Sequence, residues 1–278
     1  MKPWAKPQYI MHSPEESRAT MLRNYLSKLF DRCGIQFTDA TADGEARPFS
    51  LDDDIVLDAL SDAMAAFRAA KPFVTEDSGA DIAVVVDYFG RFHWNSQSKG
   101  KIKTGSQLFE YAPIALHKSG AAFDLVTVQD YLASKKRYRA VAFFNLFYPR
   151  PEHLAGVKAK LASDRSVAIR LAPEGAPELD LGVKTVSARE VPASGEAWAS
   201  LFRSVGSHIY VAPESYFRRQ GDLMMFCTGT TGVHTITLPA SDAGKRFRDL
   251  VNGGTYAAPT ITLKAEAPMT WLLAPAGR

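Results

Sequence analysis

The stretch that decides the fold of this chain is Ile82-Ala83-Val84-Val85-Val86, a run of five apolar residues with no polar alternation. Such a run is typical of a strand that is buried on both faces of a sheet. Ala140-Val141-Ala142-Phe143-Phe144 is a second run of the same kind, and Phe123–Val126 and Val167–Leu171 are further strand candidates. Helical stretches separate these strands. The sequence therefore predicts an α/β fold, with a mostly parallel sheet covered by helices on both faces.

Two helices are predicted before this region. The first begins at Ser13-Pro14-Glu15-Glu16, where Ser13 can cap the first free amides and Glu16 completes a capping box. The second begins at Ser50 and ends before Pro72. Its predicted apolar stripe comprises Ile55, Leu57, Leu60, Met64 and Phe67. Later helices are expected over residues 104–118, 128–133, 152–162 and 196–203.

The last part of the chain has a different pattern. Its short apolar segments are separated by glycine-rich turns such as Gly229-Thr230-Thr231-Gly232 and Asn252-Gly253-Gly254. These segments are Leu223–Cys227, Val233–Leu238, Ile261–Lys264 and Thr270–Leu273. The pattern indicates a small C-terminal antiparallel β region, and His208–Val211 is a candidate for one more buried strand before it.

Composition excludes several functional classes. Hydrophobic residues make up 46% of the chain and charged residues 23%, which is ordinary for a globular protein. The net charge of +3 comes from scattered basic residues, without the aromatic interleaving of a nucleic-acid platform. No apolar stretch approaches the roughly 20 residues of a membrane span. The first residues lack the apolar core of a signal peptide, so a cytoplasmic location is the default expectation, although a chain cut from a larger secreted protein would look the same.

Motifs for covalent catalysis and for cofactors are absent from the sequence. There is no nucleophile elbow, dinucleotide fingerprint or P-loop, and Asn145-Leu146-Phe147-Tyr148-Pro149 follows the central strand without a serine or cysteine. The histidines are single, and Cys33 and Cys227 are far apart. We therefore predict no catalytic residue, metal or cofactor. A thiol enzyme remains an alternative only if one of the cysteines is reactive.

Two carboxylates and a group of aromatic residues are the candidate sugar-binding residues. Asp39 and Asp87 each follow a predicted strand, and the carboxyl ends of strands are where α/β folds bind ligands. Phe92, His93 and Trp94 could stack on a sugar ring. The alternatives are that each carboxylate caps a loop and that the aromatic residues pack on their own domain.

Several of these stretches together resemble the amidotransferase-like domain, also called the trimerisation domain, that follows the catalytic barrel in β-galactosidases and agarase-like glycoside hydrolases. The resemblance is carried by Asp81–Asp87, by Arg139–Tyr148, by Ser166–Gly175 and, near the end, by Val205–Val211 and Thr235–Pro239. Ser13–Arg18 and Ile35–Asp39 are similar, more weakly, to the last helix and strand of the preceding barrel. The resemblance implies a flavodoxin-like sheet of the class I glutamine amidotransferase type. The resemblance also implies three domains: residues 1–75 resemble the end of a barrel, residues 76–215 are the amidotransferase-like domain, and residues 216–278 form a β region packed on that domain.

The resemblance also implies a function. A complete barrel takes about 250 residues, which do not fit before residue 80, and the barrel's catalytic carboxylates have no counterpart here. The expected role is a non-catalytic support or oligomerisation domain of a glycoside hydrolase acting on β-galactoside-type polysaccharide, with Asp39 at the rim of the sugar site. Its partners would be a glycosidase barrel or further copies of the chain, and possible carbohydrate, but neither nucleic acid nor a membrane. The alternative is a stand-alone carbohydrate-binding or regulatory protein without hydrolase activity.

Overall fold

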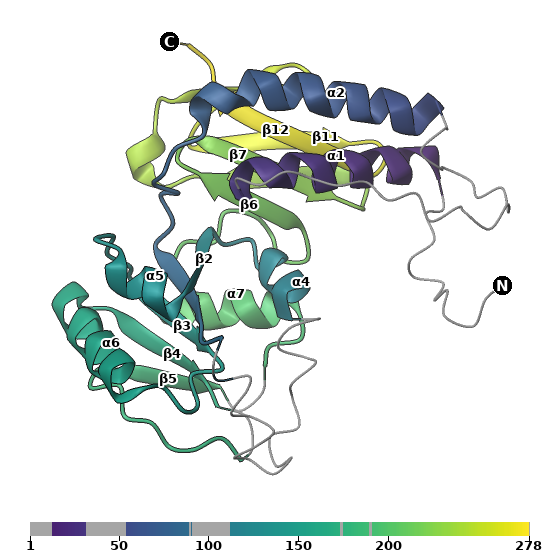
Figure 1. The fold of residues 1–278 in the computed structure, drawn as a ribbon. Helices are drawn as coiled ribbons and strands as arrows, with labels where there is room; N and C mark the ends of the chain where they lie inside the picture. The colour runs from purple at the N-terminus through teal and green to yellow at the C-terminus, as the bar shows by residue number, and fades with distance from the viewer. Residues whose placement is uncertain are drawn as a thin grey trace, which may run out of the picture. The chain divides into compact units, whose positions relative to one another are not determined.

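The chain folds into two compact units. The structure is a computed structural model and describes residues 13–31, 54–88, 90, 112–172, 175–188 and 191–277 (Figure 1). One unit is Asp77–Phe217, and the other combines Met1–Glu76 with Arg218–Arg278. The predicted division into three domains stays a prediction.

The unit Asp77–Phe217 is built on a five-stranded sheet in the order β2-β1-β3-β4-β5, with every neighbouring pair parallel. Its strands are β1 (Ile82–Val86), β2 (Phe123–Thr127), β3 (Ala140–Phe144), β4 (Val167–Leu171) and β5 (Thr185–Ala188). The predicted parallel sheet is confirmed. The sequence missed β5, because this edge strand is short and has no apolar run.

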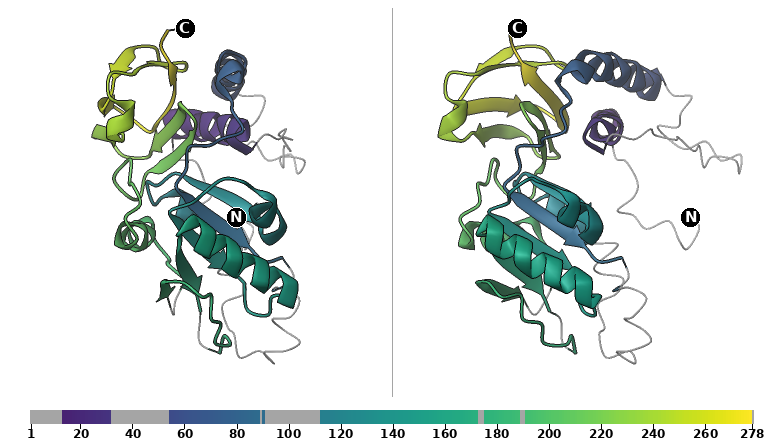
Figure 2. Two further views of the ribbon diagram at one scale, coloured as in Figure 1. Left: turned by 90° about the vertical axis from the view of Figure 1, so that its left-hand side faces the viewer. Right: turned by 60° about the vertical axis from the view of Figure 1, so that its left-hand side comes forward.

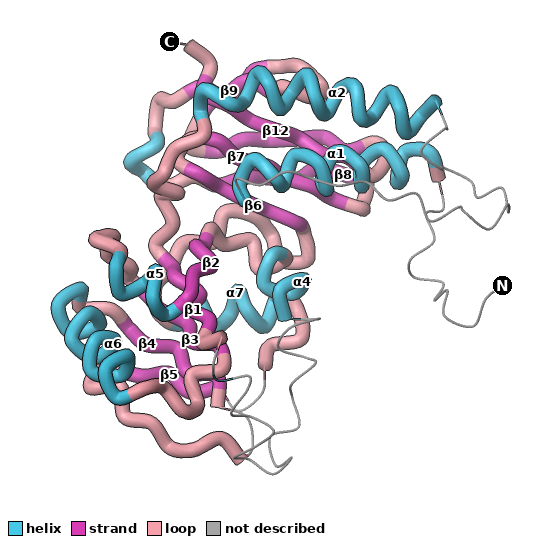
Figure 3. Tube along the Cα trace, in the orientation of Figure 1, coloured by secondary structure: helices cyan, strands magenta, loops and turns pink. Residues whose placement is uncertain are grey.

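Helices cover both faces of this sheet, as predicted (Figure 3). On one face lie α4 (Ala112–His117) and α7 (Gly195–Ser204), whose Trp198 and Phe202 are in the core. On the other lie α5 (Val128–Ala133) and α6 (Pro151–Asp164), with Tyr131 and Leu161 buried against the strands. Side chains of β1 and β3 alternate between the two cores, so these strands are buried from both sides.

One expectation for this unit is wrong, and part of another lies outside the described residues. His208–Val211 does not form a strand, since its only ladder contact among the described residues is an isolated bridge from Ile209 to Ala121. The apolar character of this segment serves core packing instead, with Tyr210 and Val211 both buried. The predicted helix 104–118 is described from Ala112 onward, and its beginning lies outside the described residues.

The second unit contains the C-terminal antiparallel strands that the sequence predicted. A five-stranded sheet has the order β10-β9-β12-β7-β6, and β11 pairs with β8 in a two-stranded sheet. The strands are β6 (Tyr216–Gln220), β7 (Leu223–Thr228), β8 (Gly232–Thr237), β9 (Arg246–Asp249), β10 (Thr255–Ala257), β11 (Thr260–Ala265) and β12 (Met269–Pro275), with a 3-10 turn, η4, at Ala240–Asp242. Strands β6, β9 and β10 were not predicted, because β6 and β9 contain charged residues and β10 is only three residues long.

Helix α1 (Pro14–Asp31) belongs to this second unit and lies beside β12 and β7 (Figure 2). It begins as predicted, with the amide of Glu16 donating to Ser13 Oγ at 3.1 Å. The Thr270 hydroxyl of β12 donates to the carbonyl of Ala19 at 2.9 Å, which ties the helix to the sheet. Of the helices in the part of the chain that the structure describes, none is long and apolar enough to cross a bilayer.

Helix α2 (Asp54–Ala70) packs on α1, and the predicted apolar stripe is right only in part. Ile55, Leu60 and Phe67 are half-buried, and the Phe67 ring lies edge-on to Tyr25 of α1, with the ring centroids 5.7 Å apart. The buried stripe is Val56, Ala59, Ala63, Ala66 and Ala70. Of the predicted stripe, Leu57 is 48% and Met64 37% exposed. Alanines let two helices approach closely, so shape rather than hydrophobicity selected the buried face. The helix ends at the 3-10 turn η2 (Lys71–Phe73), which contains Pro72, as predicted.

Candidate functional site

The structure describes one of the five predicted sugar-binding residues. Asp87 lies directly after β1, whereas Asp39, Phe92, His93 and Trp94 lie outside the described residues. The predicted assembly of a carboxylate with an aromatic loop is therefore untested. What the structure does show is the surroundings of Asp87.

Asp87 is buried at the carboxyl end of the sheet. Its amide donates to the carbonyl of Phe144 at 3.0 Å, which extends the pairing of β1 with β3 by one residue. Because Val86 is paired with Phe144, the next residues on the two strands, Asp87 and Asn145, lie side by side at the strand ends.

Asn145 has two unusual properties. Its backbone is left-handed, with φ 60°, a conformation that asparagine tolerates better than most residues. Its side chain is fully buried, and neither Oδ1 nor Nδ2 has a hydrogen-bond partner in the part of the chain that the structure describes. The sequence marked this position only as one without a nucleophile. The signal that could have found it is a polar side chain directly after the most apolar strand.

Gly90 packs directly on the residue that follows β3. A Cβ atom on Gly90 would lie 1.9 Å from the carbonyl oxygen of Asn145, so only glycine fits there. Asp87, Gly90 and Asn145 are therefore held together by direct backbone packing.

This group of three residues occupies a special point of the topology. In the order β2-β1-β3-β4-β5 the chain proceeds from β1 outward to β2 and then returns to β3 on the other side. The helices that follow β1 and β3 therefore lie on opposite faces, and a crevice can open between the carboxyl ends of these two strands. Asp87 and Asn145 lie at this switch point.

Arg170, on the neighbouring strand β4, is another buried polar residue near the same edge. Its Nη2 donates to the carbonyl of Pro177, and its Nε has no partner among the described residues. Burial lowers the pKa of the guanidinium below its ordinary value, and the charge of Glu178 opposes this shift. Together these strand ends offer donors and acceptors suited to holding a polar ligand.

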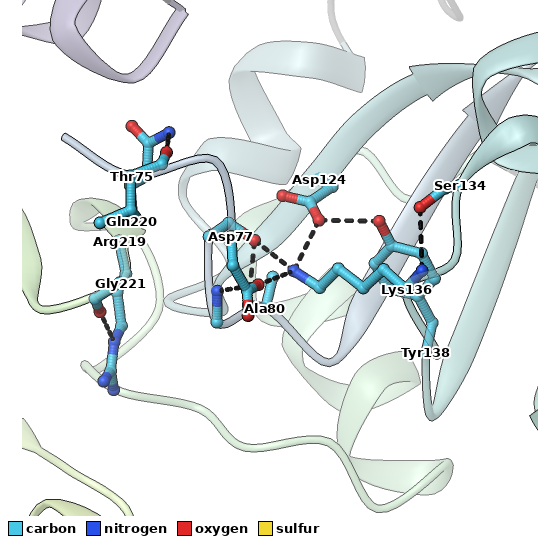
Figure 4. Close-up of polar contacts among 12 residues, drawn as sticks. Thr75, Asp77, Ala80, Asp124, Ser134, Lys136, Tyr138, Arg219, Gln220 and Gly221 are labelled. Carbon is cyan, nitrogen blue, oxygen red and sulfur yellow. Dashed lines mark hydrogen bonds and ion pairs between the residues drawn. The ribbon is translucent and has the colours of Figure 1, made fainter.

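The opposite, amino edge of the sheet carries a second polar cluster, centred on Lys136 (Figure 4). Its Nζ lies 2.6 Å from Ser78 Oγ, 2.9 Å from Asp77 Oδ1 and 2.9 Å from Asp124 Oδ2. A serine beside a lysine can act as a nucleophile when the amine is neutral and takes the proton. Here the amine instead donates to two carboxylates, as an ammonium group does.

Tyr138 completes this cluster and also favours a structural role. Its hydroxyl donates to Asp124 at 2.9 Å, and Lys136 lies over its ring at 5.2 Å. Burial, together with the charge of Asp124, raises the pKa of Tyr138, so the phenol stays protonated. The cluster joins β2 to the segments that precede β1 and β3.

The thiol alternative has little support from Cys227. This cysteine is buried in β7, and burial raises the pKa of its thiol to about 12, far from the value of a reactive thiolate. Cys33 lies outside the described residues. Among the residues that the structure does describe, no group of three histidine, cysteine, aspartate or glutamate side chains could hold a metal ion.

Comparison with known proteins finds the fold but not a family. No family model matches the sequence, and no curated protein matches it. Among solved structures, the apo exo-carrageenase GH42 from Bacteroides ovatus matches with a TM-score of 0.53 and 11% identity, over 96% of this chain and 40% of that one. The β-galactosidase from the psychrophilic Marinomonas ef1 matches with a TM-score of 0.51 and 12% identity, over 81% of this chain and 43% of that one.

At these identities the likeness concerns the fold alone. The chain spans well under half the length of either enzyme, and in the first case nearly all of it takes part in the match. This chain therefore shares its fold with a part of an exo-carrageenase and with a part of a β-galactosidase.

Proposed function

We propose that this chain is a non-catalytic part of a glycoside hydrolase that acts on a β-galactoside-type polysaccharide. In this role it packs against a catalytic barrel or against neighbouring subunits, and contributes stability, assembly and a possible edge of the sugar site. The observation that carries the proposal is the extent of the fold match, which covers 96% of this chain but 40% of the exo-carrageenase.

The chemistry of the strand ends supports the absence of catalysis. An α/β hydrolase or amidotransferase places its nucleophile on a sharp turn after a central strand. The corresponding turn here, after β3, has the left-handed backbone but carries Asn145, whose carboxamide is not a nucleophile. The lysine–serine pair at the other edge is neutralised by carboxylates. The described residues thus favour support and recognition over bond cleavage.

Activity measurements on the chain alone test the first half of the proposal. With p-nitrophenyl β-D-galactopyranoside and with a β-galactoside polysaccharide, we expect no turnover above the buffer rate. Hydrolysis at the roughly 1–1000 s⁻¹ of ordinary enzymes would overturn the non-catalytic role.

The second half is tested in the parent enzyme. The coding sequence upstream of Met1 should contain a barrel in frame. Removal of residues 13–277 from that enzyme should lower its thermal midpoint or change the number of subunits per particle, as measured by light scattering. A deletion that leaves stability, assembly and activity unchanged would reject the supporting role.

A further inference from the structure

We propose that the carboxyl ends of β1 and β3 form a sugar-binding site, in which Asp87 and Asn145 bind hydroxyl groups and Tyr88 contacts the ring. The location follows from the geometry of the described residues. The class of ligand rests on the proposed function, because it is taken to be a β-galactoside.

The first argument is the unpaired carboxamide of Asn145. Its Oδ1 and Nδ2 are both buried without a partner in the described part of the chain, and a buried polar atom without a hydrogen bond is unfavourable. A folded protein gains nothing in stability from this arrangement. A ligand that supplies one donor and one acceptor would satisfy both atoms at once.

The second argument is the position of this amide in the topology. It lies between β1 and β3, the switch point of the sheet, where open α/β sheets bind their ligands. The close approach of Gly90 to Asn145 fixes the two strand ends to each other, so the side chains of Asp87 and Asn145 are presented from a preorganised backbone.

The kinds of side chain indicate the class of ligand. A carboxylate accepts hydrogen bonds, and a carboxamide both accepts and donates them. An anion would use the donors but would meet the charge of Asp87. Hydroxyl groups donate and accept, so a neutral polyhydroxylated ligand matches the whole set.

Tyr88 favours a ring over an open-chain polyol. It follows Asp87 directly in the sequence and is 62% exposed, which is unusual for a large aromatic residue. A ring contact at the surface, combined with a few polar groups deeper down, is the usual composition of a small-molecule site. Since Asn145 is fully buried without ligand, binding requires a local rearrangement of the side chains around it, on an unchanged backbone.

The variant Asn145→Gly tests the site, because glycine accepts φ 60° and removes both unpaired atoms. In the unliganded full chain we expect its thermal midpoint to equal or exceed that of the parent. Methyl β-D-galactopyranoside is the probe. It should raise the midpoint of the parent in a concentration-dependent way, and its apparent Kd should be at least tenfold weaker for Asn145→Gly, because the variant loses the hydrogen bonds of both Oδ1 and Nδ2.

Two further variants complete the experiment. Tyr88→Ala should also weaken the response to the sugar, whereas Asn24→Ala, at an exposed position in α1, should leave it unchanged. The proposal is overturned if Asn145→Gly binds the sugar as the parent does. It is also overturned if Asn145→Gly lowers the unliganded midpoint by several degrees, which would make Asn145 a structural residue.

A parent chain that does not respond to the sugar at all also overturns the site, and an ordered water at Asn145 then explains its burial. That result leaves the supporting role intact, since the role is read from the parent enzyme's stability and assembly. Conversely, the chain could bind the sugar through Asn145 while its deletion leaves the full-length enzyme unchanged. That result rejects the supporting role and keeps the site.

Discussion

At the scale of single residues, the second unit is held by a buried ionic network around Asp242. The carboxylate lies 2.8 Å from Arg219 Nη1 and 2.7 Å from Lys245 Nζ, and Asp242 and Arg219 have side chains only 5% and 8% exposed. Asp222 also contacts Lys245, at 2.8 Å. Neutralising Asp242 leaves the buried charge of Arg219 with only its longer contact to Asp222, at 3.5 Å.

We therefore expect Asp242→Asn to lower the free energy of unfolding by about 3 kcal/mol, as measured by urea denaturation. The matched control is Lys264→Gln, which breaks the Lys264–Glu266 pair, whose side chains are 74% and 78% exposed. An exposed pair contributes at most about 1 kcal/mol. If the two variants lose equal stability, burial does not set the strength of the Asp242 network.

The same carboxylate gives a pH dependence. Burial raises the pKa of Asp242, but the hydrogen bonds and charges of Arg219 and Lys245 outweigh this effect and hold it below its usual value of 3.8. A lowered pKa means that the stabilisation is complete above the unfolded-state value and is lost as pH falls through the folded-state value.

Urea midpoints measured from pH 6 down to pH 3 should fall for the parent, and should fall less steeply for Asp242→Asn. Parallel curves for the two proteins would mean that other carboxylates, such as Asp31 with Arg218, dominate the acid response.

At the scale of elements, α7 depends on one close backbone approach. A Cβ atom on Gly195, at the start of this helix, would lie 2.1 Å from the carbonyl oxygen of Lys118. Since α7 inserts Trp198 and Phe202 into the core, any displacement of its first turn disturbs the packing on that face of the sheet.

Gly195→Ala should therefore destabilise the protein by about 1–3 kcal/mol, the range for overpacking, seen as a lower thermal midpoint and reduced near-ultraviolet dichroism. Gly229→Ala is the control, because nothing lies within 4 Å of a Cβ atom there, and its effect should stay within about 0.5 kcal/mol. A tolerated Gly195→Ala would show that α7 can shift without cost.

Elements also show where prediction from the sequence succeeds. Strands β1 and β3 were found because their runs of apolar residues have one explanation, burial on both faces. The buried face of α2 was predicted only in part, because hydrophobicity favoured Leu57 and Met64, whereas close helix packing selected alanines. Hydrophobicity alone does not reveal which of its apolar residues the neighbouring helix will cover.

At the scale of the whole molecule, the chain consists of two units that differ in continuity. Asp77–Phe217 is a single stretch with its own core on both faces of its sheet, whereas the other unit combines both ends of the chain. A continuous segment with a complete core is the usual description of an independently folding domain.

We expect residues 77–217, expressed alone, to unfold in one cooperative transition in urea and to retain the near-ultraviolet signal of the buried Trp198. A gradual transition without that signal would show that the unit needs residues from the other one to fold. The corresponding test on the second unit requires two separate segments to associate.

The sequence by itself determined the class of the fold and the absence of known catalytic motifs, because both depend on patterns along the chain: apolar runs, helix starts and glycine-rich turns. Only the tertiary structure decided which polar residues meet. Asp87 and Asn145 are 58 positions apart (145 − 87) and become neighbours through the register of β1 and β3. That Asn145 is buried with its carboxamide unpaired could not be predicted, because burial and pairing depend on packing between distant segments, which sequence patterns do not specify.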